Sequence, residues 1–195
     1  MGDTIRRMRI PVDLKHASRL LNHGPTVLVA SGDGAGRRDV MAAAWNMPLD
    51  FLPPKVAVVI DKATFTRELI AASGSFVLSV PNAAQLDMVV AVGNTSGRER
   101  DKFATYGIAT TPASQVPAPL VEGCLAWLEC KVYPEPHNEA TYDLFLAEVV
   151  AAWAEDFAFK DGHWQNLPEP QRALHHLGGG NFFTSGGLLK GTATG

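Results

Sequence analysis

The stretch from residue 40 to residue 81, VMAAAWNMPLDFLPPKVAVVIDKATFTRELIAASGSFVLSVP, combines two kinds of hydrophobic pattern. Its segment KVAVVID (55–61) is apolar on both alternating faces, which is typical of an interior strand. The next segment, TFTRELIAASG (64–74), has the spacing of a helix that Gly74 ends. SFVLSVP (75–81) is again a strand. The stretch therefore predicts two strands of one sheet with a helix inserted between them.

The segments before residue 55 extend this pattern towards the N-terminus. DLKHASRLLNHGP (13–25) is predicted to be a short amphipathic helix. TVLVAS (26–31) and DVMAAAWNM (39–47) are predicted to be the first and second strands, and PLDFLPPK (48–55) a proline-rich loop.

The segments after residue 81 are predicted in the same way. AAQLDMVVAVG (83–93) and RERDKFATYG (98–107) are read as short helices, LAWLECKVYPE (125–135) and YDLFLAEVVAAWAE (142–155) as long strands, and KDGHW (160–164) as a turn. The glycine-rich tail from residue 175 is expected to be irregular. Helices that are inserted rather than strictly alternating with strands favour a mainly β, antiparallel barrel over a doubly wound sheet.

The glycine cluster in VLVASGDGAGRRDV (27–40) raises the alternative of a dinucleotide-binding loop. That fingerprint needs G-x-G-x-x-G, and here the third glycine position holds Arg37. We interpret the segment instead as a β-hairpin turn, with Arg37, Arg38 and Asp39 as solvated residues at its tip.

The composition of the chain limits the classes of protein to which it can belong. The chain has 195 residues, 46% hydrophobic and 19% charged, and a net charge of −3, which gives no general attraction to nucleic acid. We expect one domain over residues 1–195, with a helical lead-in over 1–24 and the tail over 178–195. No apolar run is long enough for a membrane span, and the N-terminus lacks the core of a signal peptide, so we expect a cytoplasmic protein. Cys124 and Cys130 are expected to be free thiols.

The order of these segments resembles one known family. Residues 40–81, followed by VGNTSGRERDKF (92–103), LECKVY (128–133), LAEVV (146–150) and HHLGGG (175–180), are similar to the flavin reductase-like family from about Pro25 to about Gly180. The resemblance implies a six-stranded antiparallel Greek-key split β-barrel that binds FMN near the interface of a homodimer. Many members of that family use NADH or NADPH to reduce flavin, some for a partner monooxygenase, and others are electron carriers such as flavoredoxin.

The alanines of the second strand suit the flavin ring. Ala42, Ala43 and Ala44 let a flat ring approach the main chain, although small residues also ease packing in a crowded barrel. In the family this strand lies along the flavin, so the resemblance implies ring contacts for Met41 to Asn46. Trp45 stays open between a core residue and a stacking partner.

The segment DKATFTR (61–67) has residues that could bind the phosphate group of FMN. Thr64 and Thr66 lie where a helix begins, and Arg67 offers a planar fork to phosphate oxygens. Spacing alone favours a simpler reading, with Thr64 as an N-cap only and Arg67 as an exposed charge, and Lys62 could face the anion or water. The resemblance favours the phosphate, and it completes the set of cofactor-binding residues that we expect: Met41, Ala42, Ala43, Ala44, Trp45, Asn46, Asp61, Lys62, Thr64, Phe65, Thr66, Arg67, Ser96, Gly97, Lys102 and His176.

Other candidates are less defined. Ser96, Gly97 and Lys102, with Arg98 and Asp101, match a family stretch near the flavin or the interface, although their composition also fits a solvated helix start. NEATYDLF (138–145), after His137, could border a substrate pocket or form an ordinary hairpin. The adjacent His175 and His176 lack spaced partners, so no metal site is expected.

We therefore hypothesise an NAD(P)H:flavin oxidoreductase that binds FMN, possesses no dedicated catalytic side chain and acts as a homodimer, with a monooxygenase as a potential partner. The alternative is a non-catalytic FMN electron carrier. An enzyme like pyridoxamine-phosphate oxidase, on a similar barrel, fits the motifs less well.

Overall fold

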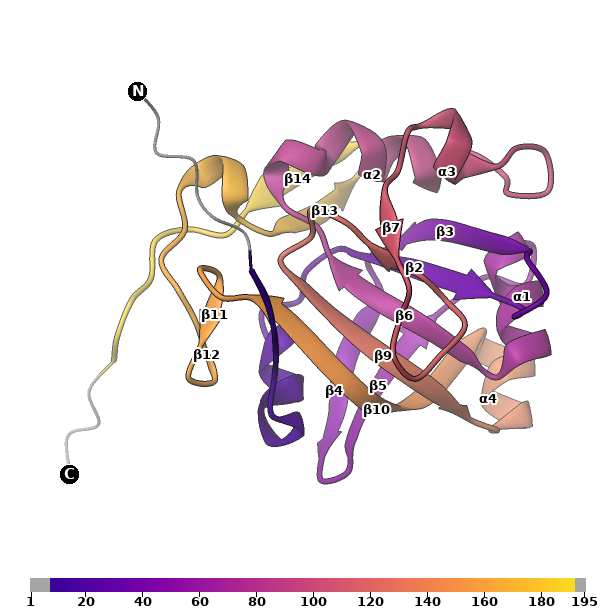
Figure 1. Ribbon diagram of the computed structural model, residues 1–195, viewed down its shortest axis with the longest axis horizontal. Coiled ribbons are helices and arrows are strands. Elements are labelled where there is room, and N and C mark those ends of the chain that lie inside the picture. The colour runs from indigo at the N-terminus through magenta and orange to yellow at the C-terminus, as the bar shows by residue number, and fades with distance from the viewer. Residues whose placement is uncertain (1–7, 192–195) are drawn as a thin grey trace.

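One antiparallel sheet organises the computed structural model, which describes residues 8–191. Its strand order is β3-β2-β6-β9-β10-β5-β4, and β1 pairs with β10. The eight strands are β1 (Arg9–Pro11), β2 (Val27–Gly32), β3 (Arg38–Ala43), β4 (Asn46–Phe51), β5 (Pro54–Val59), β6 (Ser75–Val80), β9 (Ala126–Tyr133) and β10 (Leu144–Glu155). The mainly β prediction is confirmed (Figure 1), but the sheet has eight strands where six were expected.

The two edges of this sheet are joined by a very short connection. β3 and β4 lie at opposite ends of the strand order, yet only Ala44 and Trp45 separate them in the chain. In a flat sheet six strand spacings would place them about 29 Å apart, whereas three Cα steps span about 11 Å at most. The sheet must therefore curl until its edges meet at this corner, which makes it a barrel.

Shorter elements surround the barrel. The helices are η1 (Leu14–Leu20), α1 (Phe65–Ser73), η2 (Ala83–Gln85), α2 (Leu86–Gly93), α3 (Lys102–Thr105), α4 (Pro136–Tyr142) and η3 (Glu169–Gln171). The two-stranded pairs are β7 (Thr110–Thr111) with β8 (Leu120–Val121), β11 (Phe159–Lys160) with β12 (His163–Trp164), and β13 (Leu174–Gly178) with β14 (Asn181–Thr184). Figure 1 shows α2, α3 and the β13–β14 hairpin together along one side of the sheet. None of the helices within residues 8–191 is long and apolar enough to cross a membrane.

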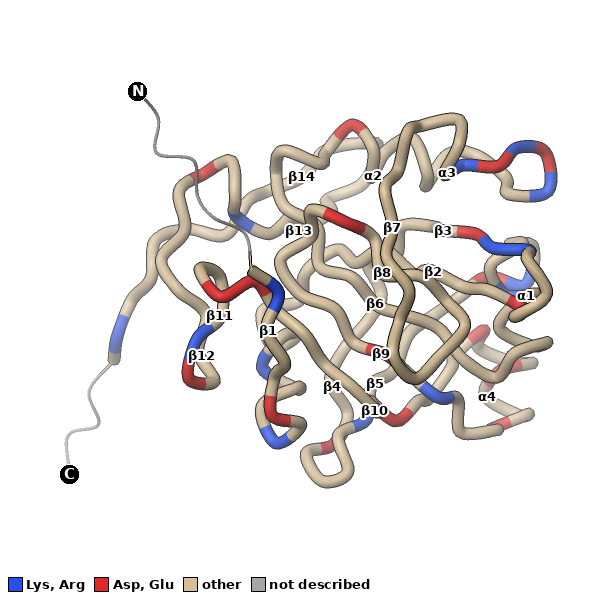
Figure 2. Tube along the Cα trace, in the orientation of Figure 1, with Lys and Arg blue, Asp and Glu red and all other residues tan. Residues whose placement is uncertain are grey.

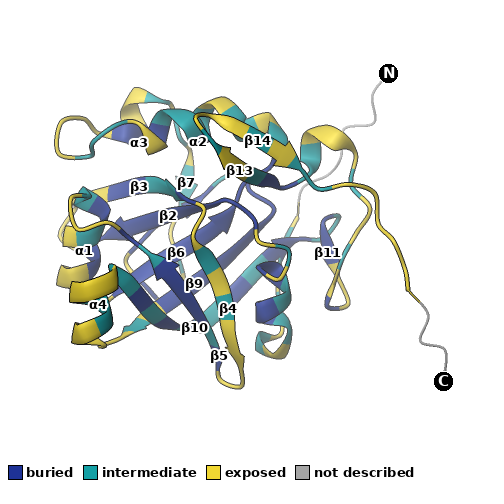
Figure 3. Ribbon diagram, turned by 180° about the vertical axis from the view of Figure 1, so that it is seen from behind, coloured by how far each residue is buried: buried dark blue, intermediate teal, exposed yellow. Residues whose placement is uncertain are grey.

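The strands β2, β6 and β9 are buried on both faces. On β2, Val27 and Val29 belong to the core inside the barrel, whereas Leu28 and Ala30 belong to a second core beneath α2 and the segment from β7 to β8. The central strands in Figure 3 are accordingly dark blue. This arrangement explains the continuous apolar runs of the sequence, since neither face of these strands meets water.

Several local predictions are confirmed. The interior strand predicted over 55–61 is β5, which lies between β10 and β4. The predicted helix after it is α1, capped by Thr64 at its start and closed by Gly74, whose φ is 66°. The Asp-Gly turn joins β11 to β12, and Cys124 and Cys130 are both buried thiols.

Other local predictions are wrong. The expected loop over 48–55 is the β4–β5 hairpin, and the strand expected over 39–47 ends at Ala43, because the chain leaves one sheet edge there and joins the other. Residues 138–145 contain most of α4, not a hairpin, and the expected helix over 98–107 is only the four residues of α3.

The glycine-rich tail also differs from its prediction. It is not irregular throughout, because β13 and β14 pair across three glycines whose positive φ values allow a tight connection. Parts of the lead-in and of the tail, residues 1–7 and 192–195, lie outside the described residues.

The hairpin turn between β2 and β3 carries one unexpected residue. Arg37 and Arg38 are exposed as predicted, but Asp39, which was expected at the solvated tip, is only 2% exposed. It is buried because an ammonium group and a hydroxyl group approach its carboxylate from other elements.

His23 makes the stability of the fold depend on pH. Both of its ring nitrogens are buried without a hydrogen-bond partner, and the rings of Trp164 and His175 lie 5.1 and 5.5 Å away. Burial, with a contribution from His175, lowers the pKa of His23 from 6.5 to about 4. The unfolded chain therefore takes up this proton first, so stability is complete above pH 6.5 and falls as the pH drops towards 4.

We expect the free energy of unfolding, measured in urea, to fall by about 2 kcal/mol between pH 7 and pH 5 through His23 alone. His23→Phe should remove this part of the pH dependence, while His163→Phe, at an exposed position, should keep it. An equal slope in His23→Phe and in the unaltered protein would contradict the assignment.

Candidate functional site

A large cavity lies where the sheet edges meet. It has a volume of about 820 Å³, which is within the usual range for sites that bind small molecules. Its lining residues come from the β3–β4 corner, the end of β5, α2, the end of α4 and the β13–β14 hairpin: Thr26, Met41, Ala42, Ala43, Ala44, Trp45, Val59, Asp61, Val89, Val90, Gly93, Asn94, Tyr142, Asp143, His176, Gly179, Gly180 and Phe182.

One wall of the cavity is a free sheet edge. Within residues 8–191, β3 pairs only with β2, and the Val40 carbonyl accepts a hydrogen bond from Lys102 on the side away from β2. Because peptide groups alternate in direction along an antiparallel strand, the backbone groups of Ala42 also point away from β2, and Ala44 follows in the corner just after the strand. The wall thus offers backbone donors and acceptors with little side-chain bulk in front of them.

The second wall is α2. A Cβ atom on Gly93 would lie 3.5 Å from the Cβ of Ala42, so helix and strand are in van der Waals contact at that point. The small side chains keep the walls close there and leave the space beside them open. Val89 and Val90 continue the apolar surface of this wall.

Aromatic rings line the remaining sides. His176 and Phe182 lie on β13 and β14 with ring centroids 5.0 Å apart, and the His176 amide donates to Thr26 Oγ1 at 3.0 Å. Trp45 and Tyr142 are 75% and 60% exposed. A planar ligand in the cavity would contact polar backbone groups of β3 on one side and aromatic rings on the other sides.

The structure brings together seven of the predicted site residues: Met41, Ala42, Ala43, Ala44, Trp45, Asp61 and His176. Tyr142, predicted to border a pocket, also lines the cavity. The sequence reasoning missed α2, Thr26 and Phe182. The apolar pattern of α2 fits a helix packed on the core equally well, so no signal in the sequence marked it as a wall.

A second group of predicted residues lies around the start of α1. Thr64 accepts the Arg67 amide as the N-cap, and its hydroxyl donates to the Asp61 carbonyl at 2.8 Å. Arg98 donates to the carbonyls of Ala63 and Thr64 and lies over the ring of Phe65. Lys62 is exposed. Asp61 belongs to both this group and the cavity.

Arg67 does not line the cavity. Its guanidinium donates to Asp143 Oδ1 at 2.7 Å, to the Ile60 carbonyl at 3.0 Å and to the Glu139 carbonyl at 2.6 Å. Both Nη atoms are therefore engaged in holding α4 against α1. This geometry corrects the expected phosphate fork, because the guanidinium is directed towards α4.

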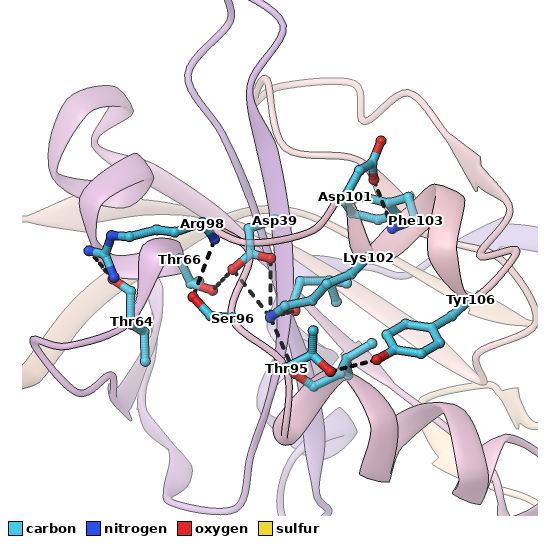
Figure 4. Close-up of polar contacts among 12 residues, drawn as sticks. Asp39, Thr64, Thr66, Thr95, Ser96, Arg98, Asp101, Lys102, Phe103 and Tyr106 are labelled. Carbon is cyan, nitrogen blue, oxygen red and sulfur yellow. Dashed lines mark hydrogen bonds and ion pairs between the residues drawn. The ribbon is translucent and has the colours of Figure 1, made fainter.

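Other predicted residues support the corner from a distance. The side-chain amide of Asn46 donates to the Pro25 carbonyl at 2.9 Å. Ser96 accepts the Arg98 amide, and Asp101 caps α3. Gly97, Lys102 and Thr66 surround the buried Asp39 carboxylate (Figure 4), so the hydroxyl of Thr66 and the ammonium of Lys102 bind Asp39 instead of facing the cavity.

The comparisons with known proteins agree with this geometry. Residues 19–168 match the family model described as flavin reductase like domain. The chain belongs to this family. The expected split-barrel class of the flavin reductase-like proteins is thereby confirmed for it.

Individual relatives lie within the same family. The chain is 50% identical over 179 residues to the Escherichia coli protein YddH, covering 91% of this chain and 95% of that protein. It is 30% identical over 129 residues to the flavin-dependent monooxygenase reductase subunit HsaB of Mycobacterium tuberculosis, covering 64% and 65%. A solved structure from Shewanella baltica OS155, described as an FMN-binding domain of a flavin reductases-like enzyme, is 44% identical with a TM-score of 0.92, covering 96% of this chain and all of that one.

Proposed function

We propose that this protein binds FMN in the cavity between β3 and α2 and reduces it with NADH or NADPH. The observation that carries the proposal is the free edge of β3, because its outward backbone groups at Ala42 match the polar edge of a flavin ring. The Shewanella baltica structure, which is 44% identical to this chain, is described as an FMN-binding domain, and this supports the choice of FMN.

We place the phosphate of FMN at the start of α1. The amides of Phe65 and Thr66 have no acceptor within the helix, and the positive end of the helix dipole lies there. Lys62 and Arg98 add positive charge, and Asp61 links this region to the cavity. Figure 2 shows basic residues near α1 and in the loop that precedes α3. Arg67 supports this site indirectly, through its bonds to α4.

Bound FMN would supply a ring that accepts hydride from the nicotinamide. The protein would orient the flavin by the peptide groups of β3 and keep water from its covered face by Val89 and Gly93. The exposed rings of Trp45 and Tyr142 would offer contact to a second planar ligand. No proton transfer by a side chain is required, so we assign no acid, base or nucleophile.

We also propose a homodimer, with β4 at its interface. Trp45, just before β4, and Met47, Leu49 and Phe51 on it are between 45% and 75% exposed. We call these exposed apolar side chains along an edge strand the apolar stripe of β4, although a bulge between Pro48 and Asp50 interrupts their alternation. Figure 3 shows this strand largely exposed beside the buried ones. The other long apolar run, from Tyr142 to Trp153, lies mostly in β10 between two other strands, so it is not available to a partner chain. We therefore base the dimer proposal on β4.

Two roles are compatible with FMN binding, that of a flavin reductase and that of an electron carrier. Reduction of the bound FMN without oxygen distinguishes them. If the protein is a reductase, NADH or NADPH added without oxygen should bleach bound FMN within seconds, followed as loss of visible flavin absorbance. Dithionite provides the positive control, since it reduces flavin without a nicotinamide site. Persistent colour at millimolar NADH and NADPH would contradict the reductase and favour the electron carrier. A monooxygenase partner stays part of the proposal, because HsaB is named as the reductase subunit of a flavin-dependent monooxygenase. The cytoplasmic location expected from the sequence also stays a proposal.

A further inference from the structure

A buried ion pair lies directly beside the cavity. Asp39 and Lys102 are 2% and 4% exposed, and the Lys102 Nζ atom lies 3.1 Å from Asp39 Oδ1. Thr66, fully buried in the first turn of α1, donates its hydroxyl to Asp39 Oδ2 at 2.7 Å. Figure 4 shows the three side chains converging from β3, α1 and α3.

The segment that precedes α3 packs closely against the Asp39–Lys102 ion pair. A Cβ atom on Gly97 would overlap the Asp39 carboxylate, so only glycine lets the chain pass so closely over it. The close approach encloses the carboxylate, and this explains why Gly97 and Lys102 stand together in a sequence motif without lining the cavity.

Lys102 has two further contacts, and each belongs to a different wall of the cavity. Its Nζ atom donates to the Val40 carbonyl at 2.7 Å and to the Val92 carbonyl at 3.2 Å. Val40 lies on β3 two residues before Ala42, and Val92 lies on α2 next to Gly93. One ammonium group therefore ties the strand wall to the helix wall beside their contact point.

We propose that Lys102 is a positioning residue that fixes the separation of β3 and α2, and thereby the width of the slot for the flavin ring. The inference rests on the proposed function, since it assigns a role at the same cavity. It differs from the expected direct contact of Lys102 with the cofactor, because Lys102 acts through Val40 and Val92. The ring of the flavin, and not its phosphate, is then the part of the ligand that depends on Lys102.

The physical reason lies in the buried groups that Lys102 satisfies. Without its ammonium, the Asp39 carboxylate keeps only the Thr66 hydroxyl among the side-chain donors described, and the Val40 carbonyl loses its donor. Buried polar groups without partners are costly, so the strand and the helix would move to reach water or other donors. A shift of about 1 Å at a binding site can cost up to about a hundredfold in function.

The test compares Lys102→Met with Lys160→Met, which removes an exposed lysine that does not line the cavity. Dissociation constants for FMN and riboflavin are measured by fluorescence quenching well below the melting temperature of each variant. We expect Lys102→Met to weaken FMN and riboflavin by the same factor, roughly tenfold or more, and to shift the visible absorption of the bound flavin. Lys160→Met should leave both dissociation constants unchanged.

Two results would overturn the inference. A loss for FMN with riboflavin unchanged would make Lys102 a phosphate ligand, and a lower melting temperature with both affinities unchanged would make its role purely structural. If Lys102→Met does not fold, the double variant Asp39→Asn with Lys102→Met, which removes both buried charges, should fold and show the same parallel loss. Failure of the unaltered protein to bind FMN would instead overturn the proposed function, so the two failures are distinguishable.

Discussion

Replacing Ala44 by phenylalanine should weaken FMN binding by roughly 10- to 100-fold. Ala44 is exposed and lines the cavity at the corner between β3 and β4. Because the position is exposed, a phenyl ring there would project over the cavity and would not enter the core. Overpacking of a fitted site costs about 1–3 kcal/mol, which corresponds to this loss.

The matched control is Ala72→Phe, at an exposed position of α1 that does not line the cavity. It should leave the FMN dissociation constant unchanged, and both variants should keep the melting temperature of the unaltered protein within a few degrees. Full FMN affinity in Ala44→Phe would show that the ring does not lie beside the free edge of β3.

The second large effect concerns the apolar stripe of β4. The double substitution Met47→Glu with Leu49→Glu should convert the proposed homodimer to a monomer at micromolar concentration. Both side chains are exposed in the single chain, at 53% and 45%, so the fold itself should tolerate the change. An unpaired charge buried at an interface costs about 2 kcal/mol or more, so the dimer dissociation constant should rise by roughly thirtyfold or more for each buried charge.

Light scattering at several protein concentrations measures the oligomeric state and the dimer dissociation constant. The control is Leu188→Glu with Leu189→Glu, which adds the same charges to two exposed leucines of the C-terminal tail, 65% and 93% exposed. The control should stay dimeric. A monomeric unaltered protein, or a dimer that survives the β4 substitutions, would remove β4 from the interface.

The sequence predicted much of the barrel because its central strands obey simple rules. Both faces of β2, β5 and β6 meet other protein, so continuous apolar runs marked them as strands. The β4–β5 hairpin was missed because prolines occupy its turn and flank it, and prolines are strong signals of a loop. Its strand β4 is also an edge strand with exposed apolar residues, which is the reverse of the usual pattern of buried apolar side chains.

Only some residues of the site could be predicted from the sequence, and the reason is physical. The alanines of β3 stand out because three small residues in a strand need a reason, and they do line the cavity. Arg67 was assigned to the cofactor because a guanidinium suits a phosphate, and Lys102 because its segment resembles a family stretch near the flavin or the interface. Which acceptor such a side chain reaches depends on long-range contacts, here Asp143 and Asp39, which lie 76 and 63 residues away in the chain.

FMN binding by the unaltered protein tests the proposed site most directly. Titration of micromolar protein with FMN, followed by fluorescence quenching, should saturate at one FMN for each chain, and FMN should bind more tightly than FAD. Absence of quenching and of any change in the visible spectrum at micromolar protein and FMN would contradict the central claim that the cavity beside β3 is an FMN site.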